Sequence, residues 1–224
     1  MILMEGKFEG VFRINGKLAT KSFAPGTRAY GEKAVREGKD EFRLWDPYRS
    51  KLSAAILRGL RQMPIKGGSK VLYLGAASGT TASHVSDIVG AKGLTYCVEF
   101  APRSMRDLLP VCEARKNMLP ILADARMPEE YAAYIKGKVD VIYEDVADPA
   151  QAGIMLANAS AFLRKGGMAM MAIKSQSIDV SAKPERTYEK VVSELAGAFE
   201  ILERIELSPF DKDHLFLLMR FKGE

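Results

Sequence analysis

The stretch Lys70–Thr81, which reads KVLYLGAASGTT, decides the fold of this 224-residue chain. An apolar run is followed by Gly75 and Gly79, and the two threonines after them open a stretch of helical composition. A strand, a glycine turn and a helix in this order open the ligand crevice of doubly wound α/β sheets. The glycine spacing is G-x-x-x-G rather than the G-x-G-x-x-G of dinucleotide-binding proteins. Taken alone, two glycines at this spacing indicate a structural turn more often than a binding site.

Short apolar runs alternate with amphipathic stretches beyond this segment. The runs are Lys70–Leu74, Leu94–Val98, Leu119–Ala123, Val139–Tyr143 and Met168–Ile173. This alternation predicts βαβ units around a buried parallel sheet. Two further strand-like runs, Phe199–Leu207 and His214–Lys222, are joined by a segment too short for a helical crossover, so we expect an antiparallel hairpin. Five parallel strands and a terminal hairpin are typical of the Rossmann-like methyltransferase sheet.

The residues before this sheet have a different pattern. From Phe8 to Phe42 the chain has short β segments separated by glycines, which predicts a small β-rich N-terminal domain over residues 1–45. Asp46 followed by Pro47 predicts an N-cap and the start of a helix that extends to Met63. The catalytic domain would then span residues 46–224.

Composition sets broad limits on function. No apolar stretch approaches the length of a membrane-spanning helix and the first residues do not form a signal peptide, so we expect a soluble, cytosolic protein with no membrane contact. Cys97 and Cys112 lack metal-ligand spacing and are interpreted as packing residues. A net charge of +5 and a pI of about 9.1 suit a polyanionic partner, but many basic proteins of this size bind no nucleic acid.

Acidic residues end the strands that follow the glycine turn. Glu99 is placed to accept hydrogen bonds from ribose hydroxyls, and Asp124, with Ala125 beside it, lies where an adenine amino group could bind. Singly, each acid would be interpreted as a solvated loop residue or a helix cap. Because the ends of three parallel strands converge, Gly75, Glu99 and Asp124 together favour an adenosyl cofactor. S-adenosylmethionine has no phosphate, so it needs only close backbone approach rather than a phosphate-binding loop.

A second polar group is predicted beside this cofactor. The fourth parallel strand ends at Asp145, the fifth ends at Lys174, and the antiparallel last strand begins at His214, so all three lie at one sheet edge. Lys51, in the first turns of the preceding helix, could face either solvent or this site. A ribose hydroxyl is a poor nucleophile, so methyl transfer to it requires in-line positioning, a proton acceptor and cations near the developing alkoxide. We favour Lys174 as the base, held by Asp145.

The chain resembles the fibrillarin family, in particular its archaeal form, over nearly its whole length. The segments that carry the resemblance are LWDPYRSKLSAAI (44–56), GAASGTTASHVSDIVG (75–90), YEDVADPAQA (143–152), IKSQSID (173–179) and SPFDKDH (208–214). The resemblance implies a catalytic set of Lys51, Asp145, Lys174 and His214. It also implies cofactor contacts, which with the turn residues give the set Gly75, Ala77, Thr80, Thr81, Glu99, Phe100, Asp124, Ala125, Asp145 and Asp148. At position 148 family members often have glutamine.

What the resemblance implies about function is guide-directed 2'-O-methylation of ribose. It implies assembly with a Nop-family scaffold protein, a kink-turn-binding protein and a box C/D guide RNA, which selects nucleotides in ribosomal or transfer RNA. The arginine- and glycine-rich arm of eukaryotic fibrillarins is absent from this sequence. Several arginines could supply local phosphate contacts, or equally form ordinary solvated surface: Arg43, Arg49, Arg58, Arg103 and Arg106.

Three other functions are weighed against this one. A nicotinamide-dependent oxidoreductase would need a phosphate-binding glycine pattern and gives His214 no role. A non-catalytic RNA-binding subunit would not need Lys51, Asp145 and Lys174 together. A methyltransferase acting on protein or a small molecule would share the sheet, which does not define the acceptor, but the lysine-containing cluster favours a hydroxyl.

Overall fold

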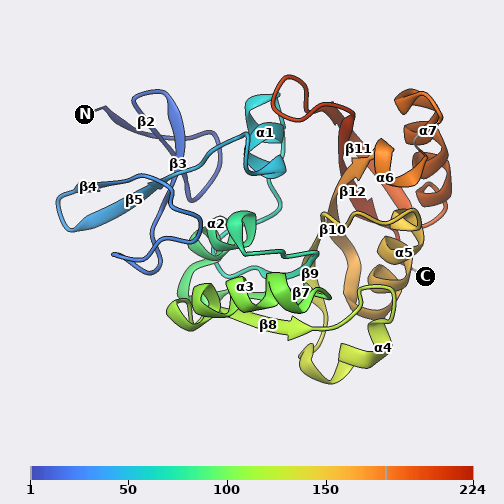
Figure 1. Cartoon of the computed structure of the whole chain (residues 1–224), viewed down its shortest axis with the longest axis horizontal. Helices are drawn as coiled ribbons and strands as arrows, with labels where there is room; N and C mark the ends of the chain where they lie inside the picture. Colours follow the sequence, from blue (N-terminus) through green and yellow to red (C-terminus); the bar gives the residue numbers. More distant parts are fainter. Residues whose placement is uncertain (1, 180, 224) are drawn as a thin grey trace.

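The computed structural model describes residues 2–179 and 181–223, which form a large and a small sheet (Figure 1). The large sheet has the strand order β11-β12-β10-β9-β6-β7-β8. Its parallel strands are β6 (Lys70–Leu74), β7 (Leu94–Glu99), β8 (Met118–Leu122), β9 (Val139–Glu144) and β10 (Leu163–Lys174). The antiparallel hairpin consists of β11 (Phe199–Glu206) and β12 (His214–Phe221). The predicted methyltransferase sheet is confirmed.

Helices cover both faces of this sheet because its central strands are apolar on both faces. The helices on one face are α1 (Lys51–Leu57), α2 (Thr80–Val89) and α3 (Pro102–Ala114). The helices on the other face are α4 (Pro128–Tyr131), α5 (Gln151–Phe162) and α7 (Pro184–Leu195), while the short α6 (Ser175–Ile178) follows β10. No helix in the described ranges is long and apolar enough to cross a membrane.

The small sheet is antiparallel and lies on the side of the molecule away from β11 (Figure 1). Its strands, in the order β1-β2-β3-β5-β4, are β1 (Leu3–Glu5), β2 (Val11–Ile14), β3 (Lys17–Lys21), β4 (Ala34–Glu37) and β5 (Asp40–Leu44). Val11, Leu18 and Trp45 belong to the same apolar cluster as residues of α2 and the large sheet. The two sheets therefore share a core, and the division into domains at residue 45 stays a prediction.

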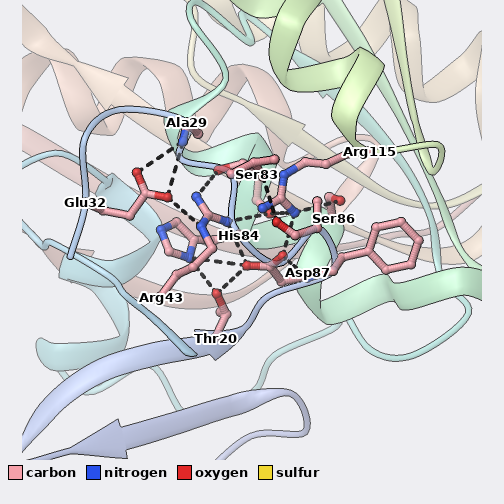
Figure 2. A network of polar contacts seen from close by, with 12 residues as sticks. Thr20, Ala29, Glu32, Arg43, Ser83, His84, Ser86, Asp87 and Arg115 are labelled. Atoms are coloured by element: carbon pink, nitrogen blue, oxygen red, sulfur yellow. Dashed lines mark hydrogen bonds and ion pairs between the residues drawn. The ribbon is translucent and has the colours of Figure 1, made fainter. Parts of the chain in front are cut away.

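A buried polar network joins the small sheet to α2 (Figure 2). Asp87 accepts hydrogen bonds from Arg43 at 2.7 Å, Arg115 at 2.5 Å, Thr20 at 2.6 Å and the backbone N–H of Phe23 at 2.8 Å. The side chains of Arg43 and Asp87 are fully buried. Arg43 therefore cannot contact an RNA phosphate, so the expectation that it belongs to a phosphate-binding surface is wrong.

His84 on α2 is part of the same network. Because Thr20 uses its only hydroxyl proton on Asp87, His84 Nδ1 donates to Thr20 Oγ1 over 2.7 Å. Its Nε2 lies 2.8 Å from the hydroxyl of Tyr30, which also reaches the carbonyl oxygen of Leu44 at 3.2 Å. Burial, with the charges of Arg43 and Arg115, holds its pKa well below the ordinary 6.5.

Helix α1 is shorter than the sequence predicts. Asp46 is not its N-cap, because the Asp46 carboxylate accepts the N–H of Tyr48 at 2.9 Å and forms a local turn. Ser50 caps the helix by accepting the N–H of Ser53, so α1 begins at Lys51 and ends at Leu57, just before Gly59 with φ +104°. The predicted helix from Pro47 to Met63 is therefore wrong in both bounds.

Candidate functional site: a cofactor cavity and an adjoining charged cluster

The glycine turn after β6 allows very close approach of two backbones. Gly75 has φ +80°, and a Cβ at this position would lie 2.5 Å from the carbonyl oxygen of Asp145. Ala77 also has a positive φ, of 47°, and Gly79, with φ +88°, leads into α2. Only glycine fits at position 75, because a side chain would displace the strand end that carries Asp145.

Glu99 at the end of β7 is fixed by this turn. One carboxylate oxygen accepts the N–H of Ala77 and the other accepts the N–H of Ala101, each at 2.8 Å. Its side chain is buried, and its remaining acceptor positions are available to a bound hydroxyl group. The acid thus both shapes the turn and serves as a fixed acceptor.

A cavity of about 480 Å³ lies over these strand ends. A volume of this size is typical of small-molecule sites. Eight of the ten predicted cofactor residues line it, namely Gly75, Ala77, Glu99, Phe100, Asp124, Ala125, Asp145 and Asp148. Thr80 and Thr81 do not line it, and Thr81 instead donates to Ser50 Oγ at 2.9 Å. Phe100 is 69% exposed, so its ring can form the rim of the cavity.

Arg126 also lines the cavity and was missed in the sequence. It contacts Asp124 at 2.5 Å, and it lies 3.8 Å from Asp148. The hydrogen bonds from Arg126 hold the pKa of Asp124 below its ordinary value. Asp148 also accepts the N–H of Ala150 at 2.7 Å, just before α5. The sequence could have suggested Arg126, because an arginine two residues after Asp124 is close enough to form an ion pair with it.

Lys51 faces the site rather than solvent. Its Nζ lies 3.1 Å from both carboxylate oxygens of Asp145, and each side chain is 23% exposed. Helix α1 therefore presents its first residue to the end of β9. Because Asp145 also lines the cavity, this ion pair lies at the boundary between the cavity and the charged cluster.

Lys174 and His214 lie side by side, as the predicted hairpin requires. They are paired in the register of β10 and β12. The backbone N–H of Lys174 donates to Gln151 at 3.3 Å, and its side chain is exposed. Within residues 2–179 and 181–223, the Lys174 amine makes no hydrogen bond or ion pair, and Asp145 contacts Lys51 instead. The structure therefore brings all four predicted residues to one edge of the sheet, but the direct ion pair among them is between Lys51 and Asp145.

His214 contacts an acid that the sequence analysis did not select. Its Nδ1 lies 2.9 Å from Asp211, in the loop between β11 and β12. The same carboxylate lies 3.8 Å from Lys51 Nζ. Asp211 could have been selected from the sequence, because it is an acid three residues before His214 in the segment SPFDKDH (208–214), which resembles fibrillarin.

Glu144, the last residue of β9, is buried without a partner. Within the described part of the chain neither of its carboxylate oxygens has a hydrogen-bond partner. Burial, together with the nearby charges of Asp145 and Asp148, holds its pKa well above the ordinary 4.5. Successive strand residues point to opposite faces, so Glu144 points away from the face on which Asp145 meets Lys51.

Comparisons with known proteins agree with this geometry. A family model described as fibrillarin matches residues 2–223. The fibrillarin-like rRNA/tRNA 2'-O-methyltransferase of Pyrococcus furiosus is 52% identical over 219 residues, which cover 96% of each chain.

Solved structures give the same result. A structure of Aeropyrum pernix fibrillarin with natively bound S-adenosyl-L-methionine matches with a TM-score of 0.90 and 48% identity over 98% of both chains. A fibrillarin/Nop5p complex matches with a TM-score of 0.89 and 41% identity, covering 97% of this chain and 100% of that one. With a family model that matches nearly every residue and relatives at about half identity, the chain belongs to the fibrillarin family.

Proposed function

We propose that this protein is an S-adenosylmethionine-dependent RNA methyltransferase that modifies the 2'-oxygen of ribose in ribosomal RNA, and in transfer RNA. The observation that carries the proposal is the ion pair between Lys51 and Asp145, since Asp145 also lines the cavity. This pair supports the proposal because a carboxylate and a cation beside the cavity would be close to both a bound cofactor and an acceptor. Relatives at about 50% identity carry the name of this activity.

The residues of the cavity fit an adenosyl cofactor. Glu99, fixed by two backbone N–H groups, would accept from ribose hydroxyls, and the exposed ring of Phe100 would stack on adenine. Asp124 and Ala125 would bind the adenine edge, while Gly75 and Ala77 allow the amino-acid end to approach the backbone. Thr80 and Thr81 do not line the cavity, so any contact they make with the cofactor would come from the start of α2.

The charged cluster has the groups that transfer to a hydroxyl requires. When bound, S-adenosylmethionine supplies an electrophilic methyl group, whose bond to sulfur breaks as a bond to the ribose oxygen forms. Lys51 would stabilise negative charge that develops on that oxygen, and Asp145 would orient Lys51. Lys174, exposed beside His214, would act as the base that takes the hydroxyl proton. His214 would position the acceptor from the opposite strand.

The protein would act within a ribonucleoprotein. A solved family member is in complex with Nop5p, which supports a Nop-family scaffold as partner. By resemblance, a kink-turn-binding protein and a box C/D guide RNA would complete the particle. Pairing of the guide with the substrate would then select the nucleotide, so this chain needs few base-specific contacts.

The test is methyl transfer in the assembled particle. Purified protein, scaffold, kink-turn protein, guide RNA and complementary RNA are incubated with tritiated S-adenosylmethionine, and the label is mapped to a nucleotide. We expect label on one ribose, lost when the guide is omitted and lost in Asp145→Ala. Cofactor binding without transfer by the wild-type protein, in a particle of verified assembly, would contradict the proposal and favour a binding subunit.

The role of Lys174 is tested in the same assay. We expect Lys174→Ala to abolish turnover while cofactor binding persists, since its amine contacts no cavity residue. Full turnover by Lys174→Ala would exclude this lysine as the base.

A further inference from the structure

Asp211 contacts two of the residues placed in the charged cluster. It lies in the loop between β11 and β12, with one oxygen 2.9 Å from His214 Nδ1 and the other 3.8 Å from Lys51 Nζ. His214 is only 8% exposed, so its ring has little freedom to turn away from this contact. Asp211 thus links the hairpin to the first residue of α1.

The contacts of His214 determine where its ring carries a proton. Nδ1 faces Asp211 at 2.9 Å and the carbonyl oxygen of Lys212 at 2.7 Å. Burial tends to raise the pKa of Asp211, but the hydrogen bond from His214 and the charges of Lys51 and Lys174 outweigh it and hold that pKa below 3.8. The carboxylate is therefore ionised and can only accept, so Nδ1 carries a proton. Nε2 is then the ring nitrogen that can face the RNA hydroxyl to be methylated.

The loop that carries Asp211 is itself anchored. Phe210 and Asp211 both direct their N–H groups to the carbonyl of Leu207, at 3.0 and 3.3 Å. The ring of Phe210 packs edge-on against Tyr48, with centroids 5.3 Å apart. Because Tyr48 lies in the turn before α1, this packing holds the loop and Lys51 in a fixed relation.

We infer that Asp211 is a positioning residue for methyl transfer, which orients His214 through Nδ1 and shares Lys51 with Asp145. This inference rests on the proposed function. Asp211 does not line the cofactor cavity, so it acts through His214 and Lys51 rather than on the cofactor. Its removal would leave the carbonyl of Lys212 as the remaining partner of Nδ1 and would leave Lys51 with one carboxylate.

Other charged groups also face His214 and must be separated from Asp211 in a test. Lys174 lies opposite it on β10, and a cleft of about 280 Å³ behind the ring includes Glu185 and Tyr188 of α7, Glu206 of β11 and Lys212. A general loss of negative charge near this cleft could alter activity without any role for Asp211. A matched control therefore has to remove one charge from the same loop.

Asp213 gives that control. It has φ +56°, which asparagine tolerates well, and among the described residues its carboxylate makes no hydrogen bond or ion pair. Asp211→Asn and Asp213→Asn make the same change of charge two residues apart. Asp211→Glu restores the charge on a side chain one methylene longer.

The experiment measures single-turnover methyl transfer in the assembled particle, together with cofactor dissociation constants and melting temperatures. For Asp211→Asn we expect kcat to fall roughly tenfold to hundredfold, since a charge-assisted hydrogen bond is lost, with cofactor affinity within about twofold. Asp211→Glu should recover most of the rate, and Asp213→Asn should stay within about twofold of wild type. Retention of at least half the rate by Asp211→Asn, or an equal loss in Asp213→Asn, would overturn the inference.

A spectroscopic measurement on the wild-type protein avoids any folding defect of the variants. The chain has only two histidines, so nitrogen-15 labelling of histidine gives two imidazoles to resolve. We expect a proton on His214 Nδ1, and its resonance should move in Asp211→Asn but not in Asp213→Asn. A proton found only on Nε2 would overturn the inference. Wild-type protein that transfers no methyl group would refute the proposed function, while this measurement would still decide the orientation of His214.

Discussion

Two charged clusters, one around Asp87 and one around Asp145 at the sheet edge, differ in how completely their charges are paired. Asp87 is fully buried between Arg43 and Arg115 and also accepts from Thr20 and Phe23 (Figure 2). In the cluster at the sheet edge, Lys51 and Asp145 are each 23% exposed.

The difference indicates two separate purposes. A buried charge is tolerated only when every acceptor is used, so the Asp87 network specifies how the small sheet packs on α2. The edge cluster keeps exposed groups that a substrate can contact. A change in the first cluster should therefore affect stability, and a change in the second should affect catalysis.

The largest expected effect is that of Asp87→Ala. Removing this carboxylate leaves Arg115 buried without a counter-charge and Arg43 with Glu32 alone, so we expect the free energy of unfolding to fall by about 3–5 kcal/mol. Urea denaturation measures the change. Glu189→Ala, which breaks an exposed ion pair with Arg204, is the control and should cost less than about 1 kcal/mol. Similar losses in the two variants would remove the distinction between the clusters.

Lys51→Met should produce the opposite pattern. If Lys51 stabilises the acceptor oxygen as proposed, its loss should lower kcat about a hundredfold or more. Stability should change by less than about 1 kcal/mol, since the pair is partly solvated. Particle assays and denaturation of the same preparation test both parts. Lys21→Met, which removes a surface lysine paired with Asp40, controls for the change of residue type. A stability loss as large as that of Asp87→Ala would contradict the comparison.

Glu144→Gln tests a buried acid that lacks any counter-charge. The raised pKa of Glu144 means that the folded protein holds a proton which the unfolded chain releases above about pH 4.5. Its contribution to stability is therefore present below pH 4.5 and is lost as the pH rises. Glutamine stays neutral in both states, so we expect the variant to gain about 1–2 kcal/mol at pH 7 and nothing below pH 4. Glu200→Gln on β11 is an exposed control, and an equal gain there would refute the explanation.

The smallest effect should come from Arg126→Gln at the rim of the cavity. Arg126 is 58% exposed, so its ion pairs with Asp124 and Asp148 are screened by water. We expect the cofactor dissociation constant to change less than about threefold. Calorimetric titration with S-adenosylmethionine measures it. A tenfold change would show that Arg126 contributes to the cofactor site far more than an exposed ion pair does.

The sequence by itself determined the large sheet and the position of its functional edge. Apolar runs alternating with amphipathic stretches predicted the five parallel strands, and the short connection between Phe199–Leu207 and His214–Lys222 left only a hairpin. These features depend on local periodicity and chain length, which a sequence contains directly. For the same reason the sequence could select Gly75, Glu99, Asp124 and Asp145, which line one cavity in the structure, since each stands at the end of a recognisable strand.

Only the tertiary structure decided which charges meet. Whether Lys51 faces solvent or Asp145 depends on the rotation of α1, which is set by its Ser50 cap and its packing. Arginine is usually a surface residue, yet Arg43 is buried, because Asp87 and Glu32 supply the opposite charges that it needs there. The contact of Asp211 with Lys51 could not be predicted either, because the two residues lie on elements far apart in the sequence. Contacts between segments far apart in the sequence depend on their distance in the folded protein. The periodicity of residues along the chain does not give that distance.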